Sequence, residues 1–320
     1  MPPAAPGRPG PASRVARLGL GLAALGRPAY INLGRDRTHP SVATLRARAH
    51  ASLDAAAEGG VAWFDAARSY GRAEEFLAGW LADRSPDAVV VSSKWGYRYT
   101  ADWDPDAEVH EVKEHSLAHF RTQLAQSRAL LGDRLALYQV HSLTVDSPLF
   151  DDPPLQEAIA GLTAQGVRTG FSTSGPEQAA AVRRGLALRV EGTPVFTAVQ
   201  STWNVLEPSV AGALAEAHDA GAHVLVKEPV ANGRLVVDPP EAVAGLAARH
   251  GVGPDAVALA AALDRPWADT VLLGGADPAQ VRSNLDAASV TLDDDDRAAL
   301  AALAEPPAQY WRHRASLPWV

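Results

Sequence analysis

The sequence predicts an α/β fold of the TIM barrel type, a closed (β/α)₈ barrel with its active site at the C-terminal ends of the strands. Eight short apolar segments alternate with helical patterns between residues 18 and 288, and strict alternation of this kind is typical of parallel α/β folds. Three consecutive apolar segments each end near an ionisable residue. The glycine pattern that follows the first strand of an open dinucleotide-binding sheet is absent, which favours the closed barrel.

The composition of the chain limits the functions to consider. Its 320 residues, of which 47% are hydrophobic, are enough for one large barrel. The chain carries 29 basic and 37 acidic residues, a net charge of -8, and so offers no basic surface for nucleic acid or an anionic membrane. The absence of cysteine excludes disulfides, thiolate metal sites and cysteine nucleophiles. No apolar segment reaches the roughly 20 residues of a membrane span, so we expect a cytoplasmic protein.

The eight strands are expected where apolar residues gather in short runs bounded by turn residues. In chain order these runs are residues 18–25, 61–64, 88–95, 135–142, 169–174, 196–203, 223–228 and 270–275. Residues 1–13, rich in proline, glycine and alanine, should form a disordered tail ahead of a barrel over residues 14–305. Residues 306–320 follow as a C-terminal segment. A loose tail is one expectation for it, and the other, folding over the pocket, is what the family resemblance given below implies.

Helical periodicity and helix-ending residues predict the segments between the strands. Ser41 follows a proline as a helix cap, and Gly59 and Gly132 mark two helix ends. The expected helices are residues 41–58, 72–82, a segment ending at 131, 154–165, 176–189, 209–220, 240–250, 254–263, 278–288 and 293–303.

Four ionisable side chains follow the second, third and fourth predicted strands. Asp65 closes the run VAWFD, Tyr70 comes five residues later, and Lys94 and His141 lie near the ends of the next two runs. Because neighbouring parallel strands lie about 4.8 Å apart, these side chains should meet at one rim of the barrel. Each also has an ordinary alternative: a capping carboxylate, a half-buried aromatic, a solvated lysine and a structural histidine.

The chemistry that fits these four residues is proton donation from Tyr70 to a carbonyl. A nearby Lys94 ammonium would lower the pKa of the phenol, and Asp65 would keep that ammonium charged. His141 can hydrogen-bond a substrate oxygen. None of the four donates hydride, so a nicotinamide cofactor is required.

Aromatic residues in two loops suggest a substrate pocket. Trp95, Tyr97 and Trp103 occupy the long loop after the third strand, where they suit a lid over an apolar or sugar-like substrate, with a plug of the barrel edge as the alternative. Tyr30 lies in the unusually long loop 27–40, which could equally be a plain surface loop. His110 and His115 are five residues apart, which disfavours one shared metal, and we expect no metal site.

The segments FDAARSYG, SSKWG and LYQVHS, taken together, resemble the strand-end motifs of the aldo-keto reductase family. The resemblance spans residues 18–289 and rests on agreement in residue type, order and spacing. It implies that Asp65, Tyr70, Lys94 and His141 are the catalytic residues and that the C-terminal segment helps choose the substrate, which places Trp311 in the pocket.

The same resemblance implies a nicotinamide nucleotide site, with NADPH (NADP+) favoured and NADH as the alternative. Thr173 stands where the family usually has Asn, and Lys227 stands where it has an aromatic that stacks on the nicotinamide, a role that Trp203 could supply instead. The implied cofactor-binding residues are Gly21, Ser172, Thr173, Gln200, Lys227, Glu228, Asn232, Arg234, Gly274, Gly275, Gln280 and Asn284.

Three functions therefore remain open from the sequence. The first is an NAD(P)H-dependent oxidoreductase that reduces an aldehyde or ketone to an alcohol, or runs in reverse on a sugar or secondary alcohol. The second is a regulatory barrel that binds nicotinamide nucleotide with little or no catalysis. The third is a lyase or isomerase without a redox cofactor. In the first case the partner is a small carbonyl or alcohol substrate.

Overall fold

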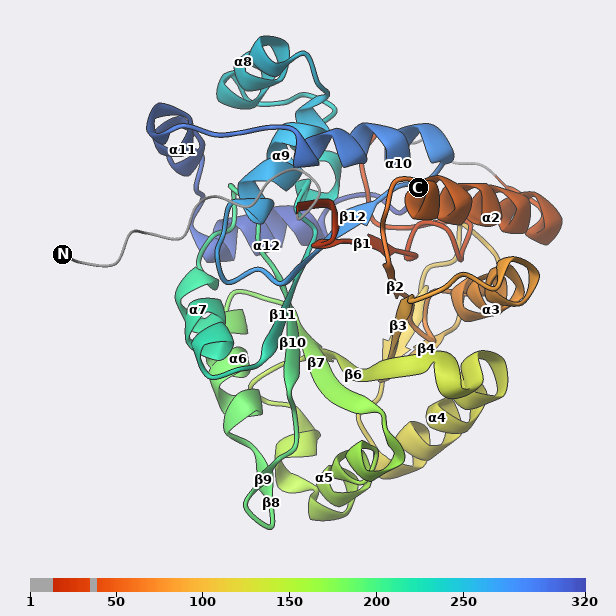
Figure 1. Ribbon diagram of the computed structural model, residues 1–320. Coiled ribbons are helices and arrows are strands. Elements are labelled where there is room, and N and C mark those ends of the chain that lie inside the picture. The colour runs from red at the N-terminus through yellow and green to blue at the C-terminus, as the bar shows by residue number, and fades with distance from the viewer. Residues whose placement is uncertain (1–13, 35–38) are drawn as a thin grey trace.

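The computed structural model describes residues 14–34 and 39–320 and confirms the predicted (β/α)₈ barrel. Eight parallel strands close in the order β1-β12-β11-β10-β7-β6-β3-β2, with helices around them (Figure 1). The expected tail over residues 1–13 lies outside the described residues. The barrel strands are β1 Leu18–Gly21, β2 Trp63–Asp65, β3 Val90–Trp95, β6 Leu135–Leu143, β7 Arg168–Thr173, β10 Ala198–Thr202, β11 His223–Lys227 and β12 Thr270–Gly274.

The helices largely follow the predicted segments. Ser41 caps the first of them by accepting from the Thr44 N–H, and Gly132 ends the third. The capping box of Asp293 and Asp296 starts the tenth. The helices are α2 Val42–Glu58, α3 Ala73–Arg84, α4 Leu117–Leu131, α5 Pro153–Ala160, α6 Gln178–Ala187, α7 Ala211–Asp219, α8 Glu241–His250, α9 Pro254–Leu263, α10 Pro278–Leu285, α11 Asp294–Ala301 and α12 Pro307–Ala315.

Short elements account for the differences from prediction. The loop after β3 contains an antiparallel hairpin of β4 Tyr97–Tyr99 and β5 Glu111–Lys113, and a second hairpin joins β8 Arg189–Val190 to β9 Thr193–Pro194. The predicted helix 154–165 breaks at Gly161, a poor helix former, into α5 and a 3₁₀ turn. That turn is η3 Thr163–Gln165, and the other 3₁₀ turns are η1 Gly132–Arg134, η2 Pro148–Asp151, η4 Ala231–Gly233 and η5 Asp286–Ala288.

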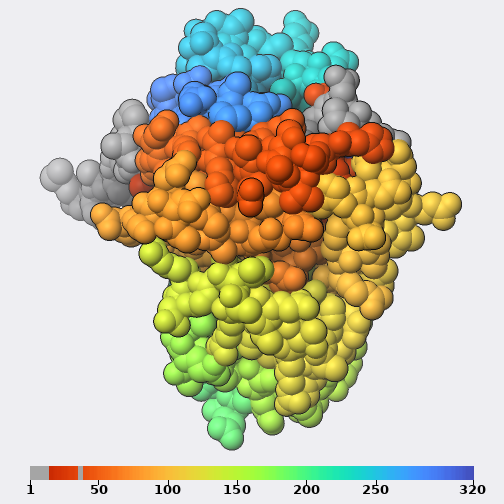
Figure 2. All heavy atoms as spheres, turned by 90° about the vertical axis from the view of Figure 1, so that its right-hand side faces the viewer, coloured from red at the N-terminus to blue at the C-terminus, as the bar shows by residue number. Residues whose placement is uncertain are grey.

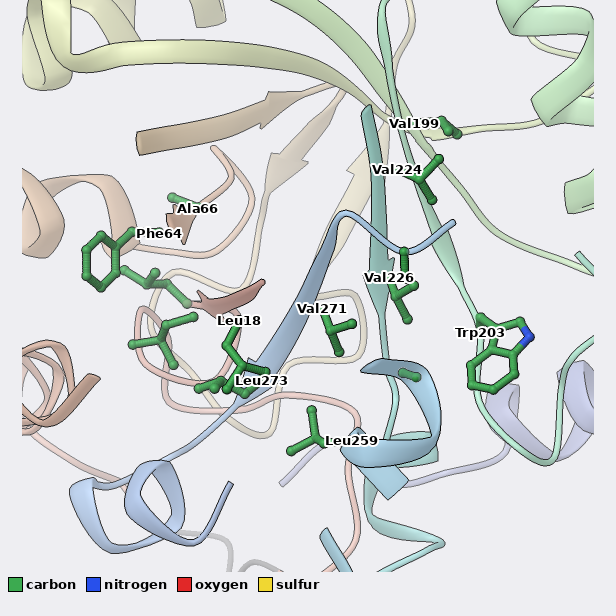
Figure 3. Packing of buried hydrophobic residues seen from close by; sticks show 14 of the residues in the cluster. Leu18, Phe64, Ala66, Val199, Trp203, Val224, Val226, Leu259, Val271 and Leu273 are labelled. Atoms are coloured by element: carbon green, nitrogen blue, oxygen red, sulfur yellow. The ribbon is translucent and has the colours of Figure 1, made fainter. Parts of the chain in front are cut away.

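The main hydrophobic core lies between the strands and the helices. Figure 3 shows part of it, where Val271 and Leu273 of β12 share a cluster with Leu259 of α9. In Figure 2 the molecule is seen from the side of α2, α3 and α4, whose atoms form a continuous surface from orange to yellow-green. This packed outer layer fixes the strands and therefore the residues at their ends.

The interior of the barrel changes from apolar to polar along the strands. Side chains alternate between the two faces of a strand, so residues two apart share a face. A separate apolar cluster, which includes Trp63, Leu137 and Leu225, fills the lower interior. Two residues further along the same strands come Asp65, Gln139 and Lys227. The alternation that buries the apolar layer therefore also directs polar side chains toward the upper end of the barrel.

Candidate active site

A buried ion pair forms the floor of the site. Lys94 of β3 and Asp65 of β2 are both almost fully buried, and the ammonium donates to the carboxylate and, at 3.0 Å, to the carbonyl oxygen of Ala66. Burial lowers the pKa of Lys94, and the Asp65 charge opposes that change. The Asp65 carboxylate also accepts hydrogen bonds at 2.7–3.3 Å from three further side chains, those of Ser92, Gln139 and Gln200.

Tyr70 lies above this pair. The Lys94 Nζ atom is 5.1 Å from the centroid of the Tyr70 ring, and the His141 ring meets the same ring edge-on at 5.5 Å. Within residues 14–34 and 39–320 no hydrogen bond ties the Tyr70 hydroxyl to another side chain, and Tyr70 lines the main cavity. The structure thus brings the four predicted catalytic residues together, with the phenol available to a ligand.

The net pKa direction of Tyr70 differs from the sequence-based expectation of a lowered value. Burial raises the pKa of the phenol, Asp65 raises it further, and Arg27 opposes them. The burial effect is the largest because little water reaches the phenol in the cavity, which penalises the phenolate. A phenol in this environment keeps its proton near neutral pH, the state that a proton donor needs.

A local irregularity in β6 presents His141 to the cavity. The register between β6 and β7 shifts between Val140 and Leu143, and Ser142 has a positive φ of 55°. Such bulges reorient a side chain at the end of a strand. Burial, followed by the charges of nearby lysines and an arginine, holds the pKa of His141 well below its usual value. His141 is therefore a neutral imidazole at pH 7.

A cluster of charged side chains, Lys227, Glu228 and Arg314, forms another part of the cavity wall. Glu228 accepts from both the Nε and an Nη atom of Arg314 in α12, and from Thr202 at 3.0 Å. Lys227 donates to Thr202 at 2.7 Å and lies 3.7 Å from Glu228. Burial raises the pKa of Glu228, but the charges of Arg314 and Lys227 and the hydrogen bonds overcome it and hold the value at about 2. Burial lowers the pKa of Lys227 to about 8.

The predicted cofactor residues divide into those that line the cavity and those that do not. The structure places on its wall Gly21, Gln200, Lys227, Glu228, Asn232, Gly274 and Gln280. It places away from that wall Ser172, Thr173, Arg234, Gly275 and Asn284. Thr173, for example, shares its hydroxyl with Ser201 at 2.7 Å and with Gln178 at 3.3 Å inside the barrel wall.

The cavity wall is chemically suited to a nicotinamide nucleotide. The Oδ1 atom of Asn232 is buried and has no hydrogen-bond partner among residues 14–34 and 39–320, and Asn232 lines the cavity. A side-chain carbon at Gly274 would meet nothing within 4 Å, so open space lies beside that backbone. An unpartnered amide oxygen and an accessible glycine backbone are groups that a polar ligand can use.

The aromatic residues predicted for the substrate pocket are only partly found there. Tyr30 and Tyr97 line the cavity. The four tryptophans do not: Trp95 packs on Phe120 in the core, and the Trp103 indole donates to the Pro40 carbonyl of the loop before α2. Trp203 packs on Trp267. Trp311 is a buried residue of α12, and its ring lies beneath the Lys227 ammonium.

Several cavity residues were not predicted. Those with charged, hydroxyl or aromatic side chains are Arg27, Glu111, Ser142, Ser174, Arg314 and Trp319. Trp319 reaches the site because residues 30–32 pair with the C-terminal residues through backbone hydrogen bonds, including an isolated bridge between Ile31 and Trp319. The sequence signal available for this contact was the tryptophan-rich tail.

Two further findings concern the described residues alone. They include no group of three or more histidine, cysteine, aspartate or glutamate side chains that could hold a metal ion. His110 instead stacks on Trp319, and His115 bonds to Ser147 and to the His141 carbonyl. No helix in this part of the chain has the length and apolar character to cross a membrane.

Comparison with known proteins adds a family and a fold. Residues 17–305 match the model of the Aldo/keto reductase family. The aldo-keto reductase AKR11C1 from Bacillus halodurans, in its holo form, aligns with a TM-score of 0.67 and 23% identity over 91% of this chain and 92% of that one. The structure of PA4992 from Pseudomonas aeruginosa, named "the putative aldo-keto reductase", aligns with a TM-score of 0.62 and 23% identity over 85% of this chain and 89% of that one. No curated protein matches the chain.

Proposed function

The chain belongs to the aldo/keto reductase family, and from this premise we propose that it is an NAD(P)H-dependent oxidoreductase that reduces an aldehyde or ketone to an alcohol. One observation carries the proposal. Asp65 of β2, Tyr70 of the loop after β2 and His141 of β6 line one cavity, and Lys94 of β3 pairs with Asp65 next to it. The Tyr70 hydroxyl has no side-chain partner among the described residues. The reverse reaction, on a sugar or another secondary alcohol, would use the same groups.

Tyr70 is the proposed proton donor to the carbonyl oxygen. When bound, a reduced nicotinamide supplies the hydride that no side chain can provide. The neutral His141 ring donates a hydrogen bond to the same oxygen and so orients the carbonyl. Lys94, fixed by Asp65, lies where its charge favours the phenolate that remains after proton transfer.

The residues proposed to hold the nucleotide are those on the cavity wall that carry unused polar capacity. Asn232 offers its free amide oxygen, Lys227 its ammonium, and Gly274 an accessible backbone. Gln200 is partly engaged with Asp65. We propose NADPH as the cofactor, with NADH as the alternative.

One feature of α10 counts against NADPH. The resemblance places the adenosine phosphate at the start of this helix, where free N–H groups would attract an anion. In the structure the Asp277 carboxylate accepts from the N–H groups of Ala279 and Gln280, both at 2.9 Å. Arg282, one turn later, is exposed and is the nearest cation on this helix. The balance between Asp277 and Arg282 therefore decides the affinity for the 2′-phosphate.

A second candidate, a regulatory barrel that binds the nucleotide without turnover, is favoured by Thr173 and Lys227. The Thr173 hydroxyl is engaged by Ser201 and Gln178, so it cannot replace the two bonds of the family's amide. Lys227 provides no ring to stack on the nicotinamide. Loss of both contacts would loosen the orientation that hydride transfer requires.

Binding and turnover assays separate these functions. The purified chain is titrated with NADPH and with NADH by fluorescence, and cofactor oxidation is then followed with a panel of aldehydes, ketones and open-chain sugars. The reductase proposal predicts saturable binding and turnover of at least one carbonyl class. Binding without turnover across the panel supports the regulatory candidate, and absence of nucleotide binding excludes both.

A further inference from the structure

Arg27, which follows β1 by six residues, is enclosed by three aromatic rings of the active site. Its side chain is only 2% exposed. The guanidinium carbon lies 5.2 Å from the ring centroid of Tyr30, 5.1 Å from that of Tyr70 and 5.0 Å from that of Trp319. A guanidinium within about 6 Å of an aromatic face is attracted by it, most strongly when both are shielded from water. Arg27 is therefore held against the Tyr70 ring at the distance at which Lys94 also approaches it.

Two directed hydrogen bonds fix the guanidinium in this position. One Nη atom donates to the Glu111 carboxylate at 2.9 Å and to the carbonyl oxygen of Ser69 at 3.1 Å. Ser69 precedes Tyr70, so Arg27 holds both the ring and the backbone beside it. The Nε atom is buried and has no hydrogen-bond partner in the part of the chain that the structure describes. The contacts with the three rings therefore hold the side chain in a position where one N–H group forms no hydrogen bond to a described residue.

The backbone beneath Arg27 is locked to the segment that carries Tyr70. A side-chain carbon at Gly26 would lie 2.2 Å from the Tyr70 carbonyl oxygen, and one at Gly71 would lie 2.5 Å from the Gly26 oxygen. Gly71 also has a φ of +60°, which favours glycine. The Arg72 N–H donates to the Gly26 carbonyl at 2.7 Å. Each glycine lets the other segment approach, and this contact places Arg27 over Tyr70.

We propose that Arg27 is a positioning residue for the Tyr70 phenol, which it holds in the orientation for proton transfer while favouring the phenolate left behind. The inference rests on the proposed function of Tyr70 as the acid. The ionisable groups around the phenol are Arg27, Asp65, Lys94, Glu111, His141 and Glu228. Lys94 is balanced from below by Asp65 and Arg27 by Glu111, so the two cations act on one ring from two separate ion pairs.

The test compares Arg27→Gln, which removes the charge, with Arg27→Lys, which keeps it. Arg72→Gln is the matched control, because Arg72 is a neighbouring arginine whose side chain is half exposed and pairs with Glu75. Steady-state reduction gives kcat and KM, and added guanidinium tests chemical rescue. In parallel, fluorotyrosine is incorporated and the ¹⁹F signal of Tyr70, identified by its loss in Tyr70→Phe, is followed against pH. Fluorine makes the phenol more acidic, which brings its titration closer to neutral pH.

We expect Arg27→Gln to lower kcat about tenfold or more with little change in KM. Its Tyr70 signal should move, with a midpoint about one pH unit higher than in the parent chain. Arg27→Lys should fall between the two, guanidinium should restore part of the rate to Arg27→Gln, and Arg72→Gln should match the parent in both assays.

An unchanged Tyr70 signal in Arg27→Gln overturns the inference. Equal losses of kcat in the Gln and Lys variants, with the Tyr70 signal unmoved, overturn it as well. Should Arg27→Gln fail to fold, the Lys variant decides: a partial loss of kcat together with a shifted Tyr70 signal agrees with the proposal. A kcat and a signal indistinguishable from the parent's, or a complete loss of rate with an unmoved signal, contradicts it. If the parent chain reduces no carbonyl, the proposed function fails, while the ¹⁹F titration still reports whether Arg27 acts on Tyr70.

Discussion

The Nζ atom of Lys94 lies 5.1 Å from the centre of the Tyr70 ring, and the same ammonium donates to Asp65. This geometry gives Lys94 two roles. It neutralises the negative charge of the buried Asp65 carboxylate, and it places a positive charge beside the Tyr70 phenol. The stability and the chemistry of the site therefore depend on the same pair.

Asp65→Asn should destabilise the fold, because it leaves the Lys94 ammonium buried without its counter-charge. Loss of one partner of a buried ion pair typically costs about 3–5 kcal/mol. Urea unfolding of Asp65→Asn and of the double variant Asp65→Asn/Lys94→Met measures this cost, and the double variant should recover part of it. A single variant within about 1 kcal/mol of the parent would show that the pair is not the structural floor described here.

His141 should leave no ionisation step near its usual value in the pH profile. Burial, with Lys94, Lys227 and Arg27 nearby, keeps its pKa well below 6.5, so the ring stays neutral as the pH falls through that value. We expect kcat/KM for reduction to stay flat from about pH 5.5 to 7, below the pKa of about 8 of Lys227. His141→Gln keeps an N–H donor and should lower kcat about 10- to 100-fold with the same flat profile. An acid limb near pH 6.5 in the parent that disappears in His141→Gln would contradict a neutral role.

Glu228 should make the fold sensitive to acid. Its pKa is about 2 in the folded chain against 4.5 ordinarily, so its contribution is complete above about pH 4.5 and is lost as the pH falls toward 2. The difference corresponds to about 3 kcal/mol, and Glu228→Gln should remove that part of the acid limb from a plot of unfolding free energy against pH. The exposed Glu241→Gln serves as control and should leave the limb intact. A Glu228→Gln profile that is parallel to the parent's would refute this assignment.

Asp277→Asn should shift cofactor preference toward NADPH. The amide can still cap α10, but the negative charge beside the expected phosphate position is gone. Removal of one like charge at a helix start predicts a rise of about threefold in the ratio of NADPH to NADH affinity. Fluorescence titration measures both dissociation constants, with Asp295→Asn on α11 as a remote control. An unchanged ratio would mean that the phosphate binds elsewhere.

The strand-end residues could be predicted because their positions follow from the barrel alone. Asp65 pairs in register with Ser92 of the next strand, and Lys94 pairs with Gln139 of the one after. Once three successive runs were assigned as parallel strands, their ends had to share one rim. The alternation of side chains also decides which neighbours do not join them. Trp95 follows the inward-pointing Lys94, so it points outward onto Phe120.

The rest of the cavity wall depends on contacts between distant segments, which a single sequence does not specify. Arg27 and Trp319 meet because the loop after β1 pairs with the end of the chain, and Arg314 reaches Glu228 because α12 packs against the barrel. The hairpin of β4 and β5 was missed for another reason. Its strands have three residues each and are largely polar, too short for periodicity to show.

The central claim, that Tyr70 donates the proton, is tested most directly by Tyr70→Phe with turnover and cofactor affinity measured on the same preparation. The variant keeps the ring between Arg27 and Lys94 and removes only the hydroxyl. We predict that kcat falls by about 10³ or more while the dissociation constant for NADPH stays within about twofold of the parent's. A Tyr70→Phe chain that still reduces its carbonyl substrate at a rate near the parent's would contradict the account.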